Sequence, residues 1–224
     1  MKAGAFAVPL AVMLAGCGSS PSDGNVALGG KAGDGAKIEE VKAQASPAAG
    51  NGPFGVTKGT PLEQLDKGAE RDAETGLAVL SSVPTPSSQF PDVAVISYPE
   101  TGICEIRAMS REFDNDSYIT AATAFADEVA GALESRYGKG KLDNGCSGHA
   151  CENQYKIQEI ESGARWYNYK WESPASKPFE NHVKSLTLWV NHTRFNDSQV
   201  RLDYVFDNEA ACASASKKAK ASNL

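Results

Sequence analysis

Two alternating segments near the C-terminal end constrain the fold more than any other feature of the sequence. Residues 183–195 and 199–206 each contain a run with apolar side chains at every second position, at 186–190 and at 200–206, and Asn-Asp-Ser lies between the two segments. A period of two residues is typical of strands with one buried face, and so short a connection makes the strands antiparallel. The face that we expect to be buried contains Leu186, Leu188, Val190, Val200, Leu202, Tyr204 and Phe206. Arg201 and Asp203 fall on the opposite face.

The strongest helical signal lies in residues 118–137. Apolar side chains recur there at steps of three and four residues, which places them on one stripe of a helix. The stripe consists of Tyr118, Ala122, Phe125, Val129 and Leu133. Asp116 or Ser117 can cap the start of this helix, and Gly138 can end it.

The rest of the folded part is expected to be rich in strands. Residues 92–109 hold two β-rich runs around Pro-Glu-Thr-Gly, which predicts a hairpin. A further strand is expected at 165–171, and Thr60 with Glu63 forms a capping box for a short helix. We therefore predict one globular α+β domain over residues 53–213. It would contain an antiparallel sheet of five or six strands with one long helix packed on one face, plus a short N-terminal helix.

The start of the chain has the composition of an export signal. Lys2 is followed by roughly 13 apolar or small residues, whereas a membrane-spanning helix needs about 20. The run ends in Leu14-Ala15-Gly16-Cys17, which resembles the lipobox of bacterial lipoproteins. This resemblance implies that residues 1–16 are a signal peptide and that Cys17 receives diacylglycerol and often a further acyl chain such as palmitate. In a cell with two membranes, Gly18 rather than Asp after the cysteine also implies the outer membrane, with the domain facing the periplasm.

Residues 17–52 join the acylated cysteine to the domain. They are rich in Gly, Ala, Ser and Pro and contain few large apolar side chains. Such a segment cannot bury enough apolar surface to offset the entropy lost on ordering. We therefore expect a disordered linker over residues 17–52, and a disordered basic tail over residues 214–224.

Four cysteines lie within the domain, and export would place them in an oxidising compartment. Four cysteines allow three pairings. We favour Cys146–Cys151, which closes a short turn-rich loop, and Cys104–Cys212, which joins a strand to the end of the domain. In the alternative, Cys146, His149 and Cys151 bind a metal, but their spacing matches no familiar zinc pattern and no fourth ligand is evident. We expect neither a metal site nor a cofactor.

No catalytic residue is predicted from the other polar side chains. The histidines stand beside no nucleophile in a known motif, and the carboxylates show no spacing typical of glycoside hydrolysis. The histidines are His149, His182 and His192, and the dispersed carboxylates include Glu105, Asp127 and Glu128. Residues 114–117 lack the glycine and the distal glutamate of an EF-hand loop, so we expect a turn and a helix cap there.

An aromatic segment, Trp-Tyr-Asn-Tyr-Lys-Trp at 166–171, is the strongest candidate for a binding surface. In a strand, Trp166 and Lys170 would lie on one face. The other face would hold Tyr167, Tyr169 and Trp171. Together with Trp189, these side chains could stack on sugar rings if they are exposed. In the alternative they fill the core or pair across strands, because Tyr and Trp are ordinary strand residues.

The opening of the domain at 54–66 is similar to that of outer-membrane assembly lipoproteins of the SmpA/BamE type. The similar residues are Gly59, Thr60, Glu63 and Leu65, although the Leu-Gly-x-Pro that usually follows is missing. The domain also resembles uncharacterised bacterial envelope proteins that combine an early Phe-Gly with a late Tyr-x-Phe and a cysteine. The matching residues are Phe54, Gly55, Tyr204, Phe206 and Cys212. Neither resemblance implies an activity.

The charge balance argues against a nucleic-acid partner. The chain has 22 basic and 28 acidic residues, a formal net charge of −6, and nucleic-acid binding depends on Lys and Arg neutralising phosphates. We expect a membrane-anchored envelope lipoprotein whose domain binds a protein or cell-wall partner without catalysis. The alternatives are an envelope enzyme that acts on glycans, and an inhibitor of a lytic enzyme.

Replacing Cys17 by Ser is expected to prevent lipid attachment, because the thioether forms on the cysteine sulfur. Each buried CH2 group contributes about 0.8 kcal/mol and two or more acyl chains anchor a protein stably, so the variant should lose its firm sedimentation with membranes. Intact-mass measurement of the mature wild-type chain should show acyl chains on Cys17. Equal sedimentation of the two proteins would contradict the lipid anchor.

Overall fold

The structure, a computed structural model, describes residues 50–152 and 156–222. The expected signal peptide at 1–16, the expected lipidation site at Cys17 and most of the expected linker lie outside the described residues. The described residues belong to one compact unit, which includes the C-terminal helix. Among them, no helix has both the length and the apolar character that a membrane crossing requires.

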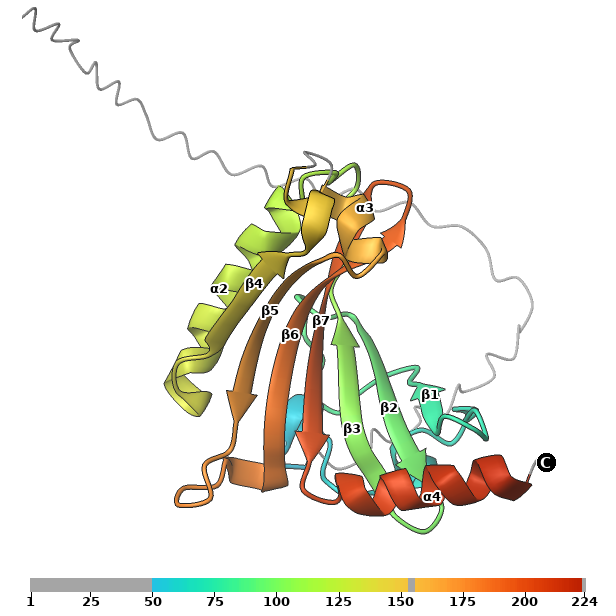
Figure 1. The fold of residues 1–224 in the computed structure, drawn as a ribbon. Helices are drawn as coiled ribbons and strands as arrows, with labels where there is room; N and C mark the ends of the chain where they lie inside the picture. The colour runs from blue at the N-terminus through green and yellow to red at the C-terminus, as the bar shows by residue number, and fades with distance from the viewer. Residues whose placement is uncertain (1–49, 153–155, 223–224) are drawn as a thin grey trace, which may run out of the picture. The chain divides into compact units, whose positions relative to one another are not determined.

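Seven antiparallel strands form one sheet, in the spatial order β1-β2-β3-β7-β6-β5-β4 (Figure 1). The strands are β1 (Leu77–Val79), β2 (Asp92–Tyr98), β3 (Gly102–Met109), β4 (Lys141–Cys146), β5 (Arg165–Glu172), β6 (Val183–Arg194) and β7 (Asp197–Phe206). The α+β class is therefore confirmed, but the sheet is larger than the five or six strands expected. Edge strand β4 was not expected, because Lys-Leu-Asp-Asn-Gly-Cys has no apolar alternation and contains residues that are depleted in strands.

Within the described ranges, four helices and three short 3-10 turns accompany the sheet. The helices are α1 (Leu62–Leu65), α2 (Thr120–Tyr137), α3 (Lys156–Glu161) and α4 (Glu209–Ser222), and the turns are η1 (Pro53–Gly55), η2 (Gly148–Cys151) and η3 (Glu180–His182). Helix α2 is the long helix expected from the sequence. Helix α1 is the expected short one, but the expected capping box does not form, because the N-cap is Pro61 and no side chain caps it.

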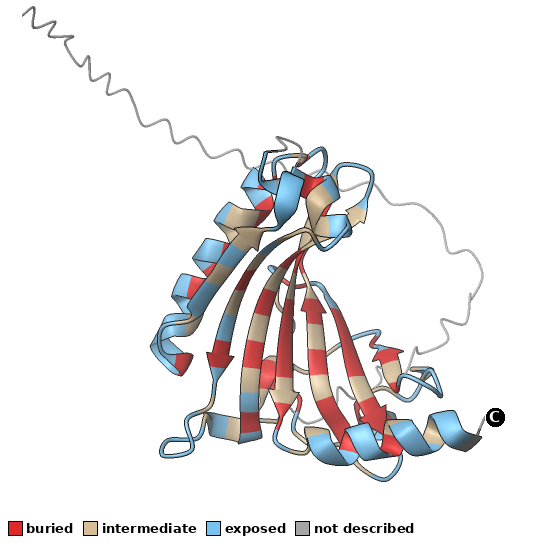
Figure 2. Cartoon of the chain, in the orientation of Figure 1, coloured by how far each residue is buried: buried red, intermediate tan, exposed pale blue. Residues whose placement is uncertain are grey.

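One face of the sheet is apolar and forms the main core. Strand register places Trp171, Leu186, Tyr204, Ile106, Val95 and Ala78 in one continuous row across six strands. Helix α2 packs on β5, β6 and β7 and buries Ala122, Ala126 and Val129. The apolar positions expected in 183–206 all lie in this core and are all buried. Buried and less buried positions alternate along much of β6 and β7 (Figure 2).

Asp116 fixes the start of α2 on the sheet. Its carboxylate accepts the backbone N–H groups of Ala121 at 3.1 Å and Ala122 at 3.0 Å. It also accepts the hydroxyl of Ser198 on β7 at 2.7 Å. The segment 114–117 is therefore a turn with a helix cap, as the sequence predicts.

Helix α4 corrects the prediction of a disordered tail at 214–224. The segment is helical through Ser222. Its small side chains at three- and four-residue steps, Cys212, Ala215 and Ala219, pack against Ile96 and Tyr98 on β2. Lysines in the last turns of the helix also interact favourably with the helix dipole. The sequence did not reveal this helix, because its buried face consists of small residues that carry a weak apolar signal.

A β-bulge in the β2–β3 hairpin directs Cys104 toward α4. Ile96 pairs with Glu105 and Ser97 pairs with Ile103, so Cys104 is the extra residue. Simple alternation would place Cys104 on the apolar face beside Ile106. The bulge instead moves it to the other face, where it forms a disulfide with Cys212 on α4 over a Cα–Cα distance of 6.4 Å.

Both expected disulfides are present, and they close loops of very different length. Cys104–Cys212 spans 108 residues and Cys146–Cys151 spans 5. On the chain-entropy estimate, Cys104→Ala/Cys212→Ala removes the disulfide that closes the long loop and should lower the free energy of unfolding by about 4 to 5 kcal/mol. Cys146→Ala/Cys151→Ala removes the short-loop disulfide and should lower it by about 2 kcal/mol. Urea unfolding of the two double variants measures these losses. A larger loss from the short loop would contradict the expected order.

Candidate binding surface on the polar face of the sheet

The sheet face opposite α2 is polar and aromatic, and no described helix lies across its middle (Figure 1). Helix α4 packs only on its end at β2 and β3. Register and strand alternation define the central residues of this polar face. They are Glu105, Arg107, Trp166, Asn168, Lys170, Thr187, Trp189, Arg201 and Asp203.

Trp189 is held at the centre of the polar face. Its indole N–H donates to Asp203 Oδ2 at 3.1 Å, and the Arg201 guanidinium carbon lies 5.7 Å from the ring centroid. Arg201 Nε also donates to Asp203 Oδ2 at 3.1 Å. Burial raises the pKa of Asp203, which is 7% exposed, against the opposing effect of Arg201. The other carboxylate oxygen, Oδ1, is buried without a hydrogen-bond partner among the described residues.

Trp166 packs on the edge strand β4. Its indole N–H donates to Asp143 Oδ1 at 2.8 Å, and Lys170 donates to the other oxygen of Asp143 at 3.1 Å. The hydrogen bond from Lys170, followed by that from Trp166, lowers the pKa of Asp143. Gly145 lies directly across from Trp166, and a Cβ atom on Gly145 would be 2.7 Å from the indole ring. The indole therefore rests on the glycine, and the side chain remains 36% exposed.

Asn168 lies between the two tryptophans. It follows Trp166 on the same face of β5 and is directly opposite Trp189 on β6. The side chain is only 3% exposed, and its Oδ1 atom has no hydrogen-bond partner in the described part of the chain. Two buried acceptor oxygens without donors, Asn168 Oδ1 and Asp203 Oδ1, therefore come from the strands on either side of Trp189.

The other three aromatic residues of the candidate surface lie on the apolar face. The hydroxyls of Tyr167 and Tyr169 donate to Asp127 on α2 at 2.5 and 2.8 Å. Burial, followed by these hydrogen bonds, raises the pKa of both phenols. Trp171 is buried and donates to the carbonyl of Gly138 at 2.9 Å. The expected division of 166–171 between two faces is confirmed, and only Trp166 and Trp189 share the polar face.

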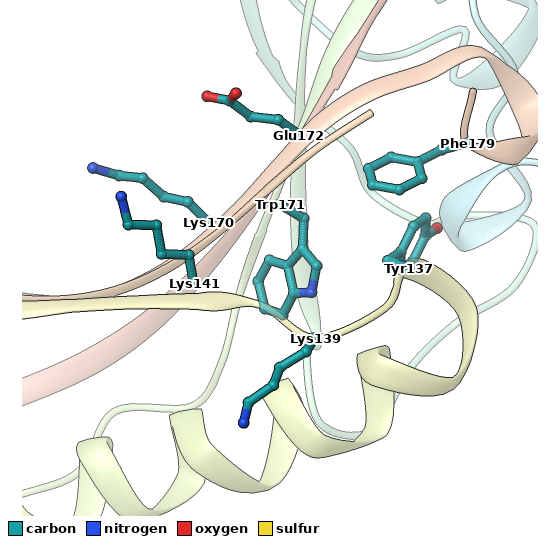
Figure 3. Close-up of a pocket in the computed structure, with 7 residues that line it drawn as sticks. All are labelled: Tyr137, Lys139, Lys141, Lys170, Trp171, Glu172 and Phe179. Atoms are coloured by element: carbon teal, nitrogen blue, oxygen red, sulfur yellow. The ribbon is translucent and has the colours of Figure 1, made fainter. Parts of the chain in front are cut away.

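Trp171 also lines a pocket of about 330 Å³ at the end of β4 and β5 (Figure 3). The pocket is lined by Tyr137, Lys139, Lys141, Lys170, Trp171, Glu172 and Phe179. Figure 3 shows Lys141, Lys170 and Glu172 projecting from the same side of the strands, away from the indole. Because Asp143 pairs with Lys170 and Glu172 lies nearby, the charges at this rim are nearly balanced.

The other polar residues considered in the sequence do not converge. Each histidine contacts a different carboxylate: His149–Glu152 at 3.8 Å, His182–Asp207 at 3.1 Å and His192–Glu161 at 3.9 Å. Glu105 pairs with Arg107 on the polar face, whereas Asp127 binds two tyrosines on the apolar face. Cys146 and Cys151 are joined over a Cα–Cα distance of 5.3 Å, so neither offers a thiolate to a metal beside His149.

An acidic cluster lies at the turn before α2. Oxygen atoms of Glu112, Asp114 and Asp197 lie within 4.8 Å of one another. Arg194 forms ion pairs with Glu112 at 3.2 Å and with Asp197 at 3.4 Å. The arginine therefore offsets part of the negative charge, and the exposed cluster has the form of a solvated ion-pair network.

Asn168, Arg201, Asp203 and Asp143, which surround the two tryptophans, were not identified as site residues from the sequence. The sequence placed Arg201 and Asp203 on the polar side of their strand, and Asn168 is on the same face of its strand as Trp166. Strand alternation could therefore have identified these three residues. Asp143 had no such signal, because β4 itself was not expected. Its role depends on the pairing of β4 with β5.

No known protein family, curated protein or solved structure matches this chain. The resemblance to lipoproteins at Leu14–Cys17, and that to the SmpA/BamE type at 54–66, therefore stay predictions from the sequence. The polar face is interpreted from its own geometry.

The buried carboxyl of Asp203 should make stability depend on pH. Because burial raises its pKa in the folded state, the folded protein binds this proton more tightly than the unfolded chain does. Ionisation then costs stability as pH rises. The free energy of unfolding of wild type minus that of Asp203→Asn should therefore be larger at about pH 4 than at about pH 7. Urea unfolding of the two proteins at both pH values measures this difference.

Asp143→Asn is the matched control for this measurement. Hydrogen bonds lower the pKa of Asp143, so its ionised form contributes stability at neutral pH that is lost as pH falls through the folded pKa. The stability of wild type relative to this variant should change with pH in the opposite direction. Parallel pH dependence of the two variants would contradict the assigned shifts.

Proposed function

We propose that this chain is a lipid-anchored lipoprotein of the bacterial outer membrane that faces the periplasm. In this proposal, its domain binds a protein or cell-wall partner without catalysis. The polar face carries the proposal: two tryptophans are hydrogen-bonded to Asp143 and Asp203 on a sheet face that no described helix covers across its middle. The Leu14–Cys17 motif supports the lipid anchor.

The two disulfides support an exported domain. All four cysteines within the domain are paired, one pair joining β3 to α4 and the other closing the loop after β4. Disulfides persist in oxidising compartments and are rare where glutathione and thioredoxin keep thiols reduced. The periplasm is such an oxidising compartment, so the covalent state of the domain agrees with the location that the N-terminal motif implies.

The polar face also has the physical properties of a pre-organised binding surface. Trp166 and Trp189 have their indole N–H groups bound to carboxylates. Side chains that are already fixed lose little conformational entropy when a ligand binds. Trp and Arg are also enriched among the residues that dominate binding energy at interfaces, and Arg201 lies over the ring of Trp189.

The carboxylates singled out in the sequence have other partners. Glu105 binds Arg107, Asp127 accepts two tyrosine hydroxyls, and Glu128 contacts Gln89 at 3.4 Å. Glu105 and Asp127 lie on opposite faces of the sheet. This arrangement favours binding over the alternative of an enzyme that acts on glycans. That enzyme and the inhibitor of a lytic enzyme are outcomes that an experiment can separate.

The test uses the full-length protein in detergent micelles as bait for an envelope extract. Wild type should retain a partner, and Trp166→Ala/Trp189→Ala should retain at least about tenfold less, because the aromatic surface is removed. Phe195→Ala is the matched control, since Phe195 is 87% exposed at the β6–β7 turn, outside the polar face.

The same samples are assayed for consumption of cell-wall glycans and for inhibition of a lytic enzyme. Retention without glycan consumption is the expected result. Turnover of a glycan with no retained partner would overturn the binding proposal in favour of the enzyme. Inhibition lost on the double substitution would identify the retained partner as a lytic enzyme.

A further inference from the structure

We propose that the polar face binds the neutral sugar rings of an oligosaccharide. Trp166 would be the stacking surface, and Asn168 Oδ1 and Asp203 Oδ1 would accept hydrogen bonds from sugar O–H or N–H groups. This inference rests on the proposed function, because it names the class of ligand for the same surface. Three observations carry it: the charge balance of the face, the two unpartnered acceptors and the placement of Trp166.

The charges of the polar face are balanced by ion pairs within it or at its edge. The pairs are Arg201–Asp203 at 3.0 Å, Arg107–Glu105 at 2.6 Å and Lys170–Asp143 at 3.1 Å. Three cations and three carboxylates thus leave no net charge for a highly charged polymer to complement. A charged ligand would have to compete with these pairs, whereas a neutral polar ligand can bind beside them. This balance favours a neutral sugar.

The two unpartnered oxygens require donors. Asn168 is 3% exposed and Asp203 is 7% exposed, and the Oδ1 atom of each is buried without a partner in residues 50–152 and 156–222. Buried polar groups in native proteins nearly always have hydrogen-bond partners. Sugars carry a high density of hydroxyl donors. Asn168 is flanked on its own strand by Lys170, an exposed side chain whose rotation on the ps–ns timescale can open access to it.

Trp166 is 36% exposed. Gly145 lies against its indole, and the hydrogen bond to Asp143 fixes the rotation of the ring. Trp189 differs, since the Arg201 guanidinium lies over its ring. A pyranose ring has an apolar C–H face that can pack on an exposed indole while its hydroxyls point outward. Trp166 is therefore the stacking surface, and Trp189 positions Asp203.

The spacing of these groups fits more than one sugar ring. Trp166 and Asn168 are two residues apart on one face of β5, or about 7 Å. Asn168 on β5 is aligned through Trp189 with Arg201 on β7, so Asp203 lies two strands across and two residues along from Asn168, or about 12 Å away. A ligand that contacts all three groups extends across the strands. An oligosaccharide can do so, whereas a single sugar ring cannot.

The probe is the β-1,4-linked tetrasaccharide of N-acetylglucosamine, which is neutral and carries both O–H and N–H donors. Calorimetric titration of full-length protein in detergent micelles should show saturable binding. Asn168→Ala should weaken it by about tenfold, the upper range for one neutral hydrogen bond. Trp166→Ala should weaken it by at least as much, because the stacking surface is lost. The Phe195→Ala control should bind like wild type. Affinity should be the same at about 50 mM and about 500 mM salt, because the neutral ligand forms no ion pair that salt could screen.

Gly145→Ala is a second variant, in which no ligand-contacting side chain is replaced. A Cβ atom at this position would lie 2.7 Å from the indole of Trp166, so the ring must move and binding should weaken. Near-UV circular dichroism and urea unfolding report whether each variant is folded. A folded Gly145→Ala protein with wild-type affinity would overturn the stacking role of Trp166.

Other outcomes separate this inference from the proposed function. It is overturned if wild type shows no saturable binding of the tetrasaccharide, or if polygalacturonate binds more tightly with strong salt dependence. If the tetrasaccharide fails but wild type still retains an envelope protein through the polar face, the sugar inference fails and the binding function stands. If neither ligand class is retained, both proposals fail.

Discussion

The pairing of β3 with β7 is the interaction on which the rest of the structure depends. It joins the N-terminal hairpin to the C-terminal strands, with Glu105 opposite Val205 and Asp203 opposite Arg107. Without it, β1–β3 and β4–β7 would be two small sheets, each with an exposed edge. The pairing makes the apolar row continuous beneath α2 and at the same time brings the charged pairs of β3 and β7 together on the polar face. The same strand pairing therefore forms both the apolar core and the candidate binding surface.

The two faces of this sheet are stabilised in different ways. On one face, α2 and the N-terminal segment bury apolar side chains, and the tyrosines of β5 are tied to α2 through Asp127. On the other, α4 covers only the end at β2 and β3, and across the middle, where no described helix lies, aromatic and charged side chains shield one another. Trp189, Arg201 and Asp203 form a small cluster whose carboxylate is largely buried by its neighbours. A surface of this kind is ordered before any ligand arrives.

The Cys104–Cys212 disulfide shows how a local irregularity can organise distant parts of the chain. The bulge at Ile96 and Ser97 turns the thiol of Cys104 away from the main core. The disulfide then holds α4 against the end of the sheet. The sequence favoured this pairing among three, because Cys146 and Cys151 lie close together in a turn-rich loop and their bond leaves Cys104 and Cys212 as partners. It did not indicate the helix, since small residues such as Ala215 give little periodic signal until a sheet is present to cover them.

The sequence by itself determined which faces of β6 and β7 are apolar and where α2 lies, because the period of the apolar pattern is a local property. It favoured the observed cysteine pairing among three and divided β5 between two faces without saying which of them is buried. Only the tertiary structure determined strand order, the bulge at Cys104 and the edge strand β4. Those features depend on contacts between residues far apart in the chain, and β4 is stable as a strand only through its pairing with β5. The candidate site divides in the same way. Alternation placed Asp203 opposite the apolar face of its strand and separated Trp166 from Tyr167. Only the assembled sheet set Trp166 on Gly145 and brought Asp203 to Trp189.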